Sequence, residues 1–476
     1  MRGKESNDRR LKGVPIRLGK GPHLFVDDFL IGYQVGLSRT THPPKRLPEP
    51  IIRKAEIWHQ QPLFCLKVIH YPDEKLFRIW YNVRNPGFRA GPVVHAYAES
   101  EDGINWRRPN LGLVETGGSR DNNLFLKGSG FGLGLIDDGP EGENPSQRFK
   151  MASFEHPGKS WGLCVAFSSD GLHWERYEGN PVLPYYEETD PRHVEAVGDI
   201  INAFYDPIRG CYAAIFKMYA TPADGYIGKS RTGGIRRLLG QSDSKDFIHW
   251  SKPRRILLPD NERDMTEFYG LDVVVRGDLG IGLVRVLRDD LSADSGGKIE
   301  GLGFTQLAVS RDGERWIRYP DVFFDRNHQP GTWDHAMAWM AAPVYVDDEM
   351  LFYYGGYSTG HKVGDRQIGL AKLPRDRYVS LDAKEEVVGI LRTPLVILDG
   401  QKMKVNVNAV GGEVKVQVSD QNLHPLLGFS YSDCEPIALD SLSHQVVWRG
   451  VDLPMGVPRH LEFRMHNAEL FGFEIE

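Results

Sequence analysis

Four copies of one short motif restrict the possible folds of this chain more than any other feature. Each copy has a serine, then Asp-Gly, two further residues and Trp, and the third copy has Phe247 in place of the glycine. The copies cover residues 100–106, 169–174, 244–250 and 310–316. The aspartate accepts backbone hydrogen bonds and the glycine adopts positive φ, so each copy predicts a tight turn whose Trp packs between sheets. Their near-constant spacing predicts a radial or stacked repeat.

Each period of the repeat also contains an apolar run, a turn and a second apolar run. The four clearest pairs of runs are 66–70 with 76–81, 200–205 with 211–216, 271–275 with 281–286, and 343–346 with 350–354. A fifth pair, 133–137 with 148–154, has a longer turn. Helical periodicity is nearly absent, and each period suits a four-stranded blade. The sequence therefore predicts an all-β protein with a five-bladed β-propeller, whose ring residues 24–31 close against the last blade.

The pattern changes after Leu381. The later runs alternate apolar and polar residues, which is typical of an antiparallel β-sandwich; they are 402–408, 413–418, 445–448, 460–465 and 470–475. Gly411-Gly412 separates the first two runs and predicts a hairpin turn. The expected organisation is a polar N-terminal tail over residues 1–20, a propeller over residues 21–380 and a C-terminal β-sandwich over residues 381–476.

Composition excludes several classes of protein. The net charge of -6 argues against broad nucleic-acid binding, and the pairs Arg107-Arg108 and Arg236-Arg237 are interpreted as solvated surface. No apolar run approaches the ~20 residues that span a bilayer, and residues 1–20 lack the apolar core of a signal peptide, so a cytoplasmic location is expected by default. The four cysteines lie in apolar runs without a CxxC pair, which predicts buried free thiols.

The first strand of each propeller blade lines a central channel, where residues distant in sequence meet. Ionisable residues at the start of these strands are therefore the candidates for chemistry. The catalytic candidates are Asp199, Glu267 and Asp334. The candidates for binding a substrate are Glu56, Trp58, His59, Asn122, His193, Glu195, Trp333, His335 and His361.

Clustered carboxylates suit the cleavage of a glycosidic bond. One carboxylic acid protonates the leaving oxygen while a second carboxylate acts as nucleophile or activates water. Aromatic rings provide platforms for sugar faces. Structural alternatives remain open, since Asp199 can cap a strand and the run 333–335 can be structural. Asp206-Pro207 is interpreted as turn chemistry. His193 and Glu195 with Asp199 form only a weak metal signal, so neither a metal nor a cofactor is expected.

Several of these segments resemble bacterial proteins described as glycoside hydrolase family 32-like, which belong with the fructosidases and arabinanases among the five-bladed-propeller hydrolases. The segments that carry the resemblance are 24–31, the four motif copies, 333–334 with 354–356, and the tail segments 428–430, 446–450 and 461–470. The resemblance implies three channel carboxylates, with Asp199 and Glu267 as transition-state stabiliser and acid. The fructosidase signature Trp-Met-Asn-Asp-Pro-Asn-Gly, which carries the nucleophile, is absent, and residues 56–62 stand in that region.

Three hypotheses follow from the sequence. The first is a glycoside hydrolase that acts on an oligo- or polysaccharide, with no nucleic-acid or membrane partner. The second is a carbohydrate-binding propeller without catalysis, which the missing nucleophile favours. The third is a protein-interaction scaffold, which acidic and aromatic residues gathered in the channel would contradict.

Overall fold

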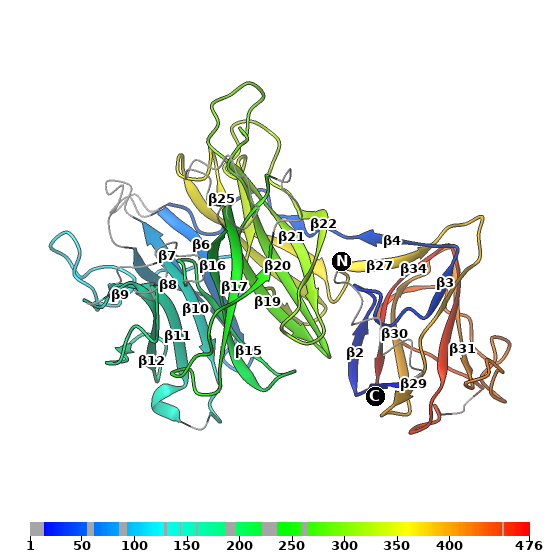
Figure 1. Ribbon diagram of the computed structural model, residues 1–476. Helices are drawn as coiled ribbons and strands as arrows, with labels where there is room; N and C mark the ends of the chain where they lie inside the picture. The colour runs from blue at the N-terminus through cyan, green and yellow to red at the C-terminus, as the bar shows by residue number, and fades with distance from the viewer. Residues whose placement is uncertain are drawn as a thin grey trace.

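The computed structural model describes residues 14–54, 61–84, 93–127, 131–142, 144–158, 160–185, 197–220, 236–258, 265–449 and 452–476. These residues form an all-β protein, in which a single 3-10 turn at Pro145–Gln147 is the one helical element described. Within the same ranges, no helix has the length and apolar character needed to cross a membrane. Figure 1 shows a larger group of sheets beside a smaller body that contains the end of the chain.

Five antiparallel sheets follow one another in the larger group. The first is β6 (Gln61–Tyr71), β7 (Leu76–Arg84), β8 (Val94–Ser100) and β9 (Leu124–Lys127). The second is β10 (Phe131–Asp137), β11 (Phe149–Glu155), β12 (Gly162–Ser168) and β13 (Glu175–Arg176), with β14 (Leu183–Pro184) on β12. The third is β15 (Asn202–Asp206), β16 (Cys211–Ala220), β17 (Arg236–Ser244) and β18 (Arg254–Leu257).

The fourth sheet is β19 (Glu267–Arg276), β20 (Leu279–Arg288), β21 (Leu302–Ser310) and β22 (Ile317–Phe324). The fifth is β23 (Met337–Met340), β25 (Glu349–Tyr357), β26 (Arg366–Pro374) and β5 (Lys45–Arg46), with β24 (Val344–Val346) on β25. One parallel pairing, Gly303 with Met337, joins these two sheets. The five strand pairs expected from the sequence are all present.

A strand from the N-terminal region completes the fifth sheet, but not the strand expected. β5 pairs with β26, whereas β2 (Gly21–Leu24) pairs with β34 (Ala468–Ile475) in the smaller body. The reason lies in the apolar side chains that follow β2. Phe25 and Leu30 are fully buried in the core of the smaller body, so this segment belongs there.

The first strands of all five sheets meet around one axis. A cavity of about 20 Å³ is lined by residues of β6, β10, β15 and β19 and by Ala341-Ala342, which directly follow β23. Consecutive sheets pack against each other, and β6 of the first sheet packs against β25 and β26 of the fifth. Residues distant in sequence are therefore neighbours along this axis.

The repeated motif forms the predicted turn. In the first copy, Asp102 Oδ1 accepts hydrogen bonds from the backbone N–H groups of Ile104 and Asn105, at 2.8 and 2.7 Å. Gly103 has φ +71°, and the indole of Trp106 donates to its carbonyl. The same aspartate bonds recur at Asp170, Asp246 and Asp312.

The turns also link neighbouring sheets. The Tyr353 hydroxyl of the fifth sheet donates to the carbonyl of Gly103 in the first, at 3.0 Å. The Trp80 indole of the first sheet donates to the carbonyl of Gly171, which follows β12 of the second sheet, at 2.8 Å. A third bond of this kind joins Gln241 to Gly313. Each such bond ties the end of one sheet to the sheet beside it.

The smaller body contains two facing sheets. One is β32 (Asp440–Gln445), β30 (Met403–Asn408), β34, β27 (Val379–Ala383) and β4 (Leu37–Thr41), with β2 also on β34. The other is β3 (Tyr33–Val35), β28 (Gly389–Arg392), β33 (His460–His466) and β31 (Glu413–Ser419), and β1 (Ile16–Leu18) pairs separately with β29 (Val396–Leu398). Strands from residues 16–41 thus lie with the C-terminal strands, although the sequence predicts a propeller over residues 21–380.

Two expectations for this body are wrong. Gly411-Gly412 does not form a hairpin, because β30 pairs with β32 and β34 while β31 pairs with β33 in the facing sheet. The valines of both strands fill the same core from opposite sides, which the alternation alone does not distinguish from a hairpin. The run 445–448 is not a strand either, because the strand there is β32, which ends at Gln445.

Candidate active site

Two ion pairs lie where the third and fourth sheets meet. Asp199 precedes β15, and its Oδ1 pairs with the ammonium of Lys217 on β16. The Lys217 side chain is only 4% exposed, whereas that of Asp199 is 25% exposed. Burial lowers the pKa of Lys217, but the Asp199 charge and the neighbouring tyrosines raise it by more. The net shift of this pKa is therefore upward. Lys217 is therefore a permanent cation beside an accessible carboxylate.

The second ion pair joins β19 to β17. Arg237 Nη1 lies 2.6 Å from Glu267 Oε2, and the backbone N–H of Arg237 donates to the same oxygen at 3.1 Å. Both side chains are almost completely buried. Burial raises the pKa of Glu267 by more than Arg237 lowers it, so the net shift is upward. A carboxyl of this kind stays protonated at a higher pH than an exposed one.

Tyr269 on β19 brings the two pairs together. Its ring centroid lies 4.7 Å from Lys217 Nζ and 5.5 Å from Arg237 Cζ. The ring stacks on Trp339 of β23, with centroids 4.8 Å apart and an interplanar angle of 20°. The third and fourth sheets therefore bring two cations, each paired with a carboxylate, to one aromatic ring.

More aromatic rings continue this cluster. Phe64 on β6 meets Trp339 edge-on with centroids 4.7 Å apart, and lies 5.7 Å from Tyr269. Tyr357 on β25 lies 6.4 Å from Phe64. These rings come from the first, fourth and fifth sheets, so they form an apolar platform across the axis.

Asp289 and His361 complete the charged part of the cluster. Asp289 follows β20, and its Oδ2 lies 4.0 Å from Arg237 Nη1. Its Oδ1 lies 3.7 Å from His361 Nδ1, and His361 meets the ring of Tyr269 edge-on at 4.8 Å. Burial lowers the pKa of His361 to about 4 although Asp289 opposes the shift. The imidazole is therefore neutral near pH 7.

Sequence reasoning missed three members of this cluster: Lys217, Arg237 and Asp289. Arg236-Arg237 was interpreted as solvated surface, which is wrong because both residues are at most 3% exposed. The sequence does carry one indication of their role. Lys217 and Arg237 lie beside long apolar runs, and an isolated cation in a buried strand requires a partner. Arg107, in contrast, has a side chain that is 71% exposed, as expected.

Asp334 lies among other partners. Its side chain is 1% exposed, and Oδ2 accepts hydrogen bonds from Arg46 Nη1 at 2.5 Å and from the Tyr354 hydroxyl at 3.0 Å. Arg46 belongs to β5, the outermost strand of the fifth sheet. Trp333 stacks on Tyr354 and donates to the carbonyl of Pro48. The cationic partners of Asp199 and Glu267 lie at one ring, whereas Asp334 is bonded to β5 of the fifth sheet.

The other described binding candidates make local bonds. The nitrogens of His335 meet the carbonyl of Asn327 and Asp294 Oδ1, both at 2.9 Å. The Asn122 amide donates to the carbonyl of Val114 within its own loop. Among the described binding candidates, His361 contacts the cluster around Tyr269. Five others lie outside the described residues: Glu56, Trp58, His59, His193 and Glu195.

A charged cluster also occupies the axis further along β19. Asp272 lies five residues beyond Glu267, about 16 Å along an extended strand, and forms an ion pair with the fully buried Arg285. Burial raises the pKa of Asp272, against the effect of Arg285 and Lys67. Asp272 and Lys67 line the cavity of about 20 Å³, so this part of the axis has little free space.

A larger cleft, of about 300 Å³, lies between the two bodies rather than on the axis. It is lined by residues of both, including Arg276, Asp376 and Lys404. Arg276 and Asp376 satisfy each other through two hydrogen bonds, at 2.5 and 2.9 Å. The Asp376 carboxylate of this cleft is therefore already occupied by Arg276.

Comparisons with known proteins give distant similarities. No family model matches the chain, and no curated protein matches it. Among solved structures, a glycosyl hydrolase from Bacteroides ovatus is 15% identical, over 75% of this chain and 98% of the other, with a TM-score of 0.44. A β-fructofuranosidase from Schwanniomyces occidentalis complexed with fructosyl-erythritol is 11% identical, over 95% of this chain and 98% of the other, with a TM-score of 0.42.

A third similar structure, an N-acetylgalactosamine deacetylase from F. plautii in complex with blood group B trisaccharide, is 16% identical over 71% of this chain and 96% of the other, with a TM-score of 0.42. At such similarity the chemistry of this chain has to be inferred from its own residues.

Proposed function

We propose that the five sheets form a closed five-bladed propeller over residues 45–374, and that residues 16–41 and 379–476 form the sandwich. Three observations support closure. β5 completes the fifth sheet, and Tyr353 of that sheet donates to Gly103 of the first. The first strands of four sheets and the segment after β23 of the fifth line one cavity. A closed ring places the inner edges of the sheets in a channel, away from other chains.

We infer that the protein is a glycoside hydrolase, with its catalytic residues in the propeller channel. The observation that carries this inference is that the cationic partners of Asp199 and Glu267, which belong to different sheets, both lie against the ring of Tyr269. Cleavage of a glycosidic bond requires two carboxyl groups with different roles. Their surroundings differ as the reaction requires, because Glu267 is buried and Asp199 is accessible.

Glu267 is proposed as the general acid. Burial raises the pKa of its carboxyl, so it can hold a proton for the leaving oxygen. Asp199 is proposed as the carboxylate that attacks the anomeric carbon or activates water, and its Oδ1 is paired with the ammonium of Lys217. Tyr269 keeps 8% of its surface exposed and is the ring of this pair that a sugar can reach, while the fully buried Trp339 stacks on it. Asp289 and neutral His361 are placed to bond hydroxyls.

Asp334, the third candidate from the sequence, is better suited to holding β5 in place. Its bonds to Arg46 and Tyr354 join β5 to β25 within the fifth sheet. Asp334→Asn separates the two roles. If Asp334 is structural, the substitution lowers the melting temperature of the protein and leaves kcat per folded molecule nearly unchanged. If Asp334 is catalytic, the substitution lowers kcat and leaves the melting temperature nearly unchanged.

A turnover screen tests the proposed function. The protein is incubated with a panel of plant, algal and microbial oligosaccharides, and released sugars are separated by chromatography. For a substrate so identified, Glu267→Gln and Asp199→Asn are expected to lower kcat by at least about 100-fold with the fold retained. Glu155→Gln is the control, since Glu155 is also buried and paired with an arginine, Arg176, but lies on β11. Full activity of Glu267→Gln would remove it from the mechanism.

A carbohydrate-binding propeller without catalysis is the second candidate. The observation that favours it is that both carboxylates already have cationic partners, so they are suited to holding hydroxyl groups. Calorimetric binding of a glycan with no released sugar, and weaker binding by Asp199→Asn, would support this function over hydrolysis.

A further inference from the structure

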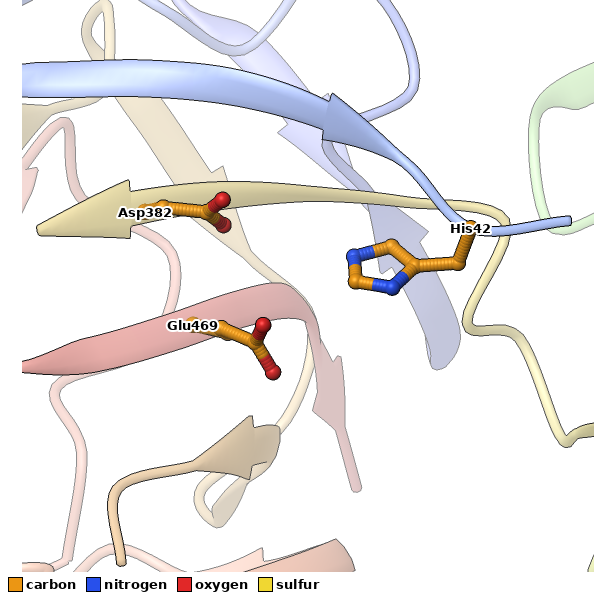
Figure 2. Close-up of side chains that lie close together, drawn as sticks. All are labelled: His42, Asp382 and Glu469. Carbon is orange, nitrogen blue, oxygen red and sulfur yellow. The ribbon is translucent and has the colours of Figure 1, made fainter. Parts of the chain in front are cut away.

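Three metal-binding side chains lie together outside the channel. His42 directly follows β4, Asp382 lies on β27 and Glu469 lies on β34, which are three neighbouring strands of one sandwich sheet. Figure 2 shows the imidazole and both carboxylates directed toward the same space. One ligand atom from each of the three residues lies within 4.8 Å of the others. This cluster is separate from the carboxylates of the proposed active site.

The charges of this cluster favour a bound cation. Asp382 and Glu469 are direct partners in the pairing of β27 with β34. Like charges at directly opposed positions of an antiparallel pair are destabilising. Among the described residues, no lysine or arginine forms an ion pair with either carboxylate, and the Thr40 hydroxyl that donates to Asp382 Oδ2 is neutral. Two negative charges and a histidine therefore face one another, and a divalent cation would neutralise both charges.

Neighbouring side chains already orient the three groups. The Ser380 hydroxyl donates to Asp382 Oδ1 and lies 2.7 Å from His42 Nε2. The Asn408 amide donates to Glu469 Oε2 at 3.0 Å. Such outer bonds hold metal ligands in position and leave the remaining lone pairs free for an ion. All three side chains are half-buried, so an ion can enter from solvent.

We propose that His42, Asp382 and Glu469 bind a divalent transition-metal ion of the Zn²⁺ type. One imidazole nitrogen and two carboxylate oxygens are ligands that Zn²⁺ accepts, with water in a fourth position. Ca²⁺ requires six to eight oxygen ligands and is not suited to a site with one nitrogen and few oxygens. The site follows from the sandwich sheet alone and does not depend on the proposed hydrolase function.

The position of His42 gives the ion a structural role. His42 lies between β4, which belongs to the sandwich, and β5, which completes the fifth sheet of the larger group. A metal held by His42, Asp382 and Glu469 would attach this connecting segment to β27 and β34. Metal binding is therefore expected to stabilise the junction of the two bodies.

Calorimetry and thermal unfolding test the site. Tag-free protein is stripped with a chelator and titrated with ZnCl₂, and one ion per chain with a raised melting temperature is expected. His42→Ala and Glu469→Gln are expected to weaken Zn²⁺ binding by more than about tenfold and to lose the thermal shift. His424→Ala is the control, because His424 is an exposed histidine beside Asp420 in the same sandwich. It should bind Zn²⁺ as the unaltered protein does.

Two further measurements keep the result interpretable. Metal-free Glu469→Gln should melt no lower than the metal-free parent, because it removes the repulsion with Asp382, and this excludes misfolding as the cause of lost binding. CaCl₂ should give no comparable shift. Failure to bind one Zn²⁺, equal binding by His42→Ala, or an equal response to Ca²⁺ would overturn the proposal.

Discussion

Substituting Gly103 by alanine should destabilise the protein through two separate effects. Gly103 has φ +71°, and a residue with a Cβ in this left-handed region costs about 1–2 kcal/mol. The new Cβ would also lie 2.6 Å from the Tyr353 hydroxyl oxygen, which is too close for contact. Tyr353 must then move, and its hydrogen bond to the Gly103 carbonyl is lost. That bond contributes about 1 kcal/mol, so the expected loss of unfolding free energy is about 2–3 kcal/mol.

Gly112→Ala is the matched control for this change. Gly112 has φ +67°, but nothing lies within 4 Å of the position that a Cβ would take, so only the backbone cost of about 1–2 kcal/mol applies. Equilibrium unfolding in urea, followed by tryptophan fluorescence, measures both variants. Adding Tyr353→Phe to Gly103→Ala should cost less than the sum of the single changes, because the two act on one contact. Equal destabilisation by Gly103→Ala and Gly112→Ala would refute the link between the fifth and first sheets.

Two other substitutions test buried ionisable side chains. Burial lowers the folded-state pKa of His95 from 6.5 to about 4, so its stabilising contribution is complete above pH 6.5 and is lost as the pH falls toward 4. Urea unfolding at pH 7 and pH 4.5 measures this effect. Between these two pH values, the free energy of unfolding should fall by up to about 3 kcal/mol less in His95→Gln than in the parent protein. An identical fall in both proteins would contradict the assignment. Arg311→Met should lower the free energy of unfolding by about 3 kcal/mol, because Arg311 holds the half-buried Asp27 through two hydrogen bonds. The control is Arg315→Met at an exposed arginine, which should change this free energy by no more than about 0.5 kcal/mol. Equal effects at the two arginines in the same unfolding assay would show that the Asp27 contact contributes nothing.

The repeat made the sheets predictable, because its chemistry is local. Asp102 and Gly103 form their turn with residues two or three positions away, so the motif reports it directly. The sequence is a weaker guide to the pairing of distant strands. β2 is Gly-Pro-His-Leu and β5 is only Lys-Arg, and neither short pattern tells which of them joins β26. That choice depends on where Phe25 finds a core. Such a choice is made by packing over long range, which periodicity does not encode.

The candidate site was predictable in part for the same reason. Asp199 and Glu267 precede or begin first strands, and the channel geometry alone selects them. Lys217 and Arg237 lie on second and third strands, where the sequence shows only a cation next to apolar residues. Their role becomes visible when adjacent sheets bring them to Tyr269. Asp334 shares the strand-start position of the others, but its Arg46 partner lies 288 residues away in sequence.

A ligand-bound structure of Glu267→Gln is the most direct test of the channel chemistry. Crystals are soaked with the glycan that the screen shows to be bound or cleaved. We expect a sugar ring against Tyr269, the glycosidic oxygen about 3 Å from the residue 267 side chain, and the anomeric carbon facing Asp199. A glycan seated in the cleft between the two bodies, or one with neither carboxylate position near its glycosidic bond, would contradict this expectation.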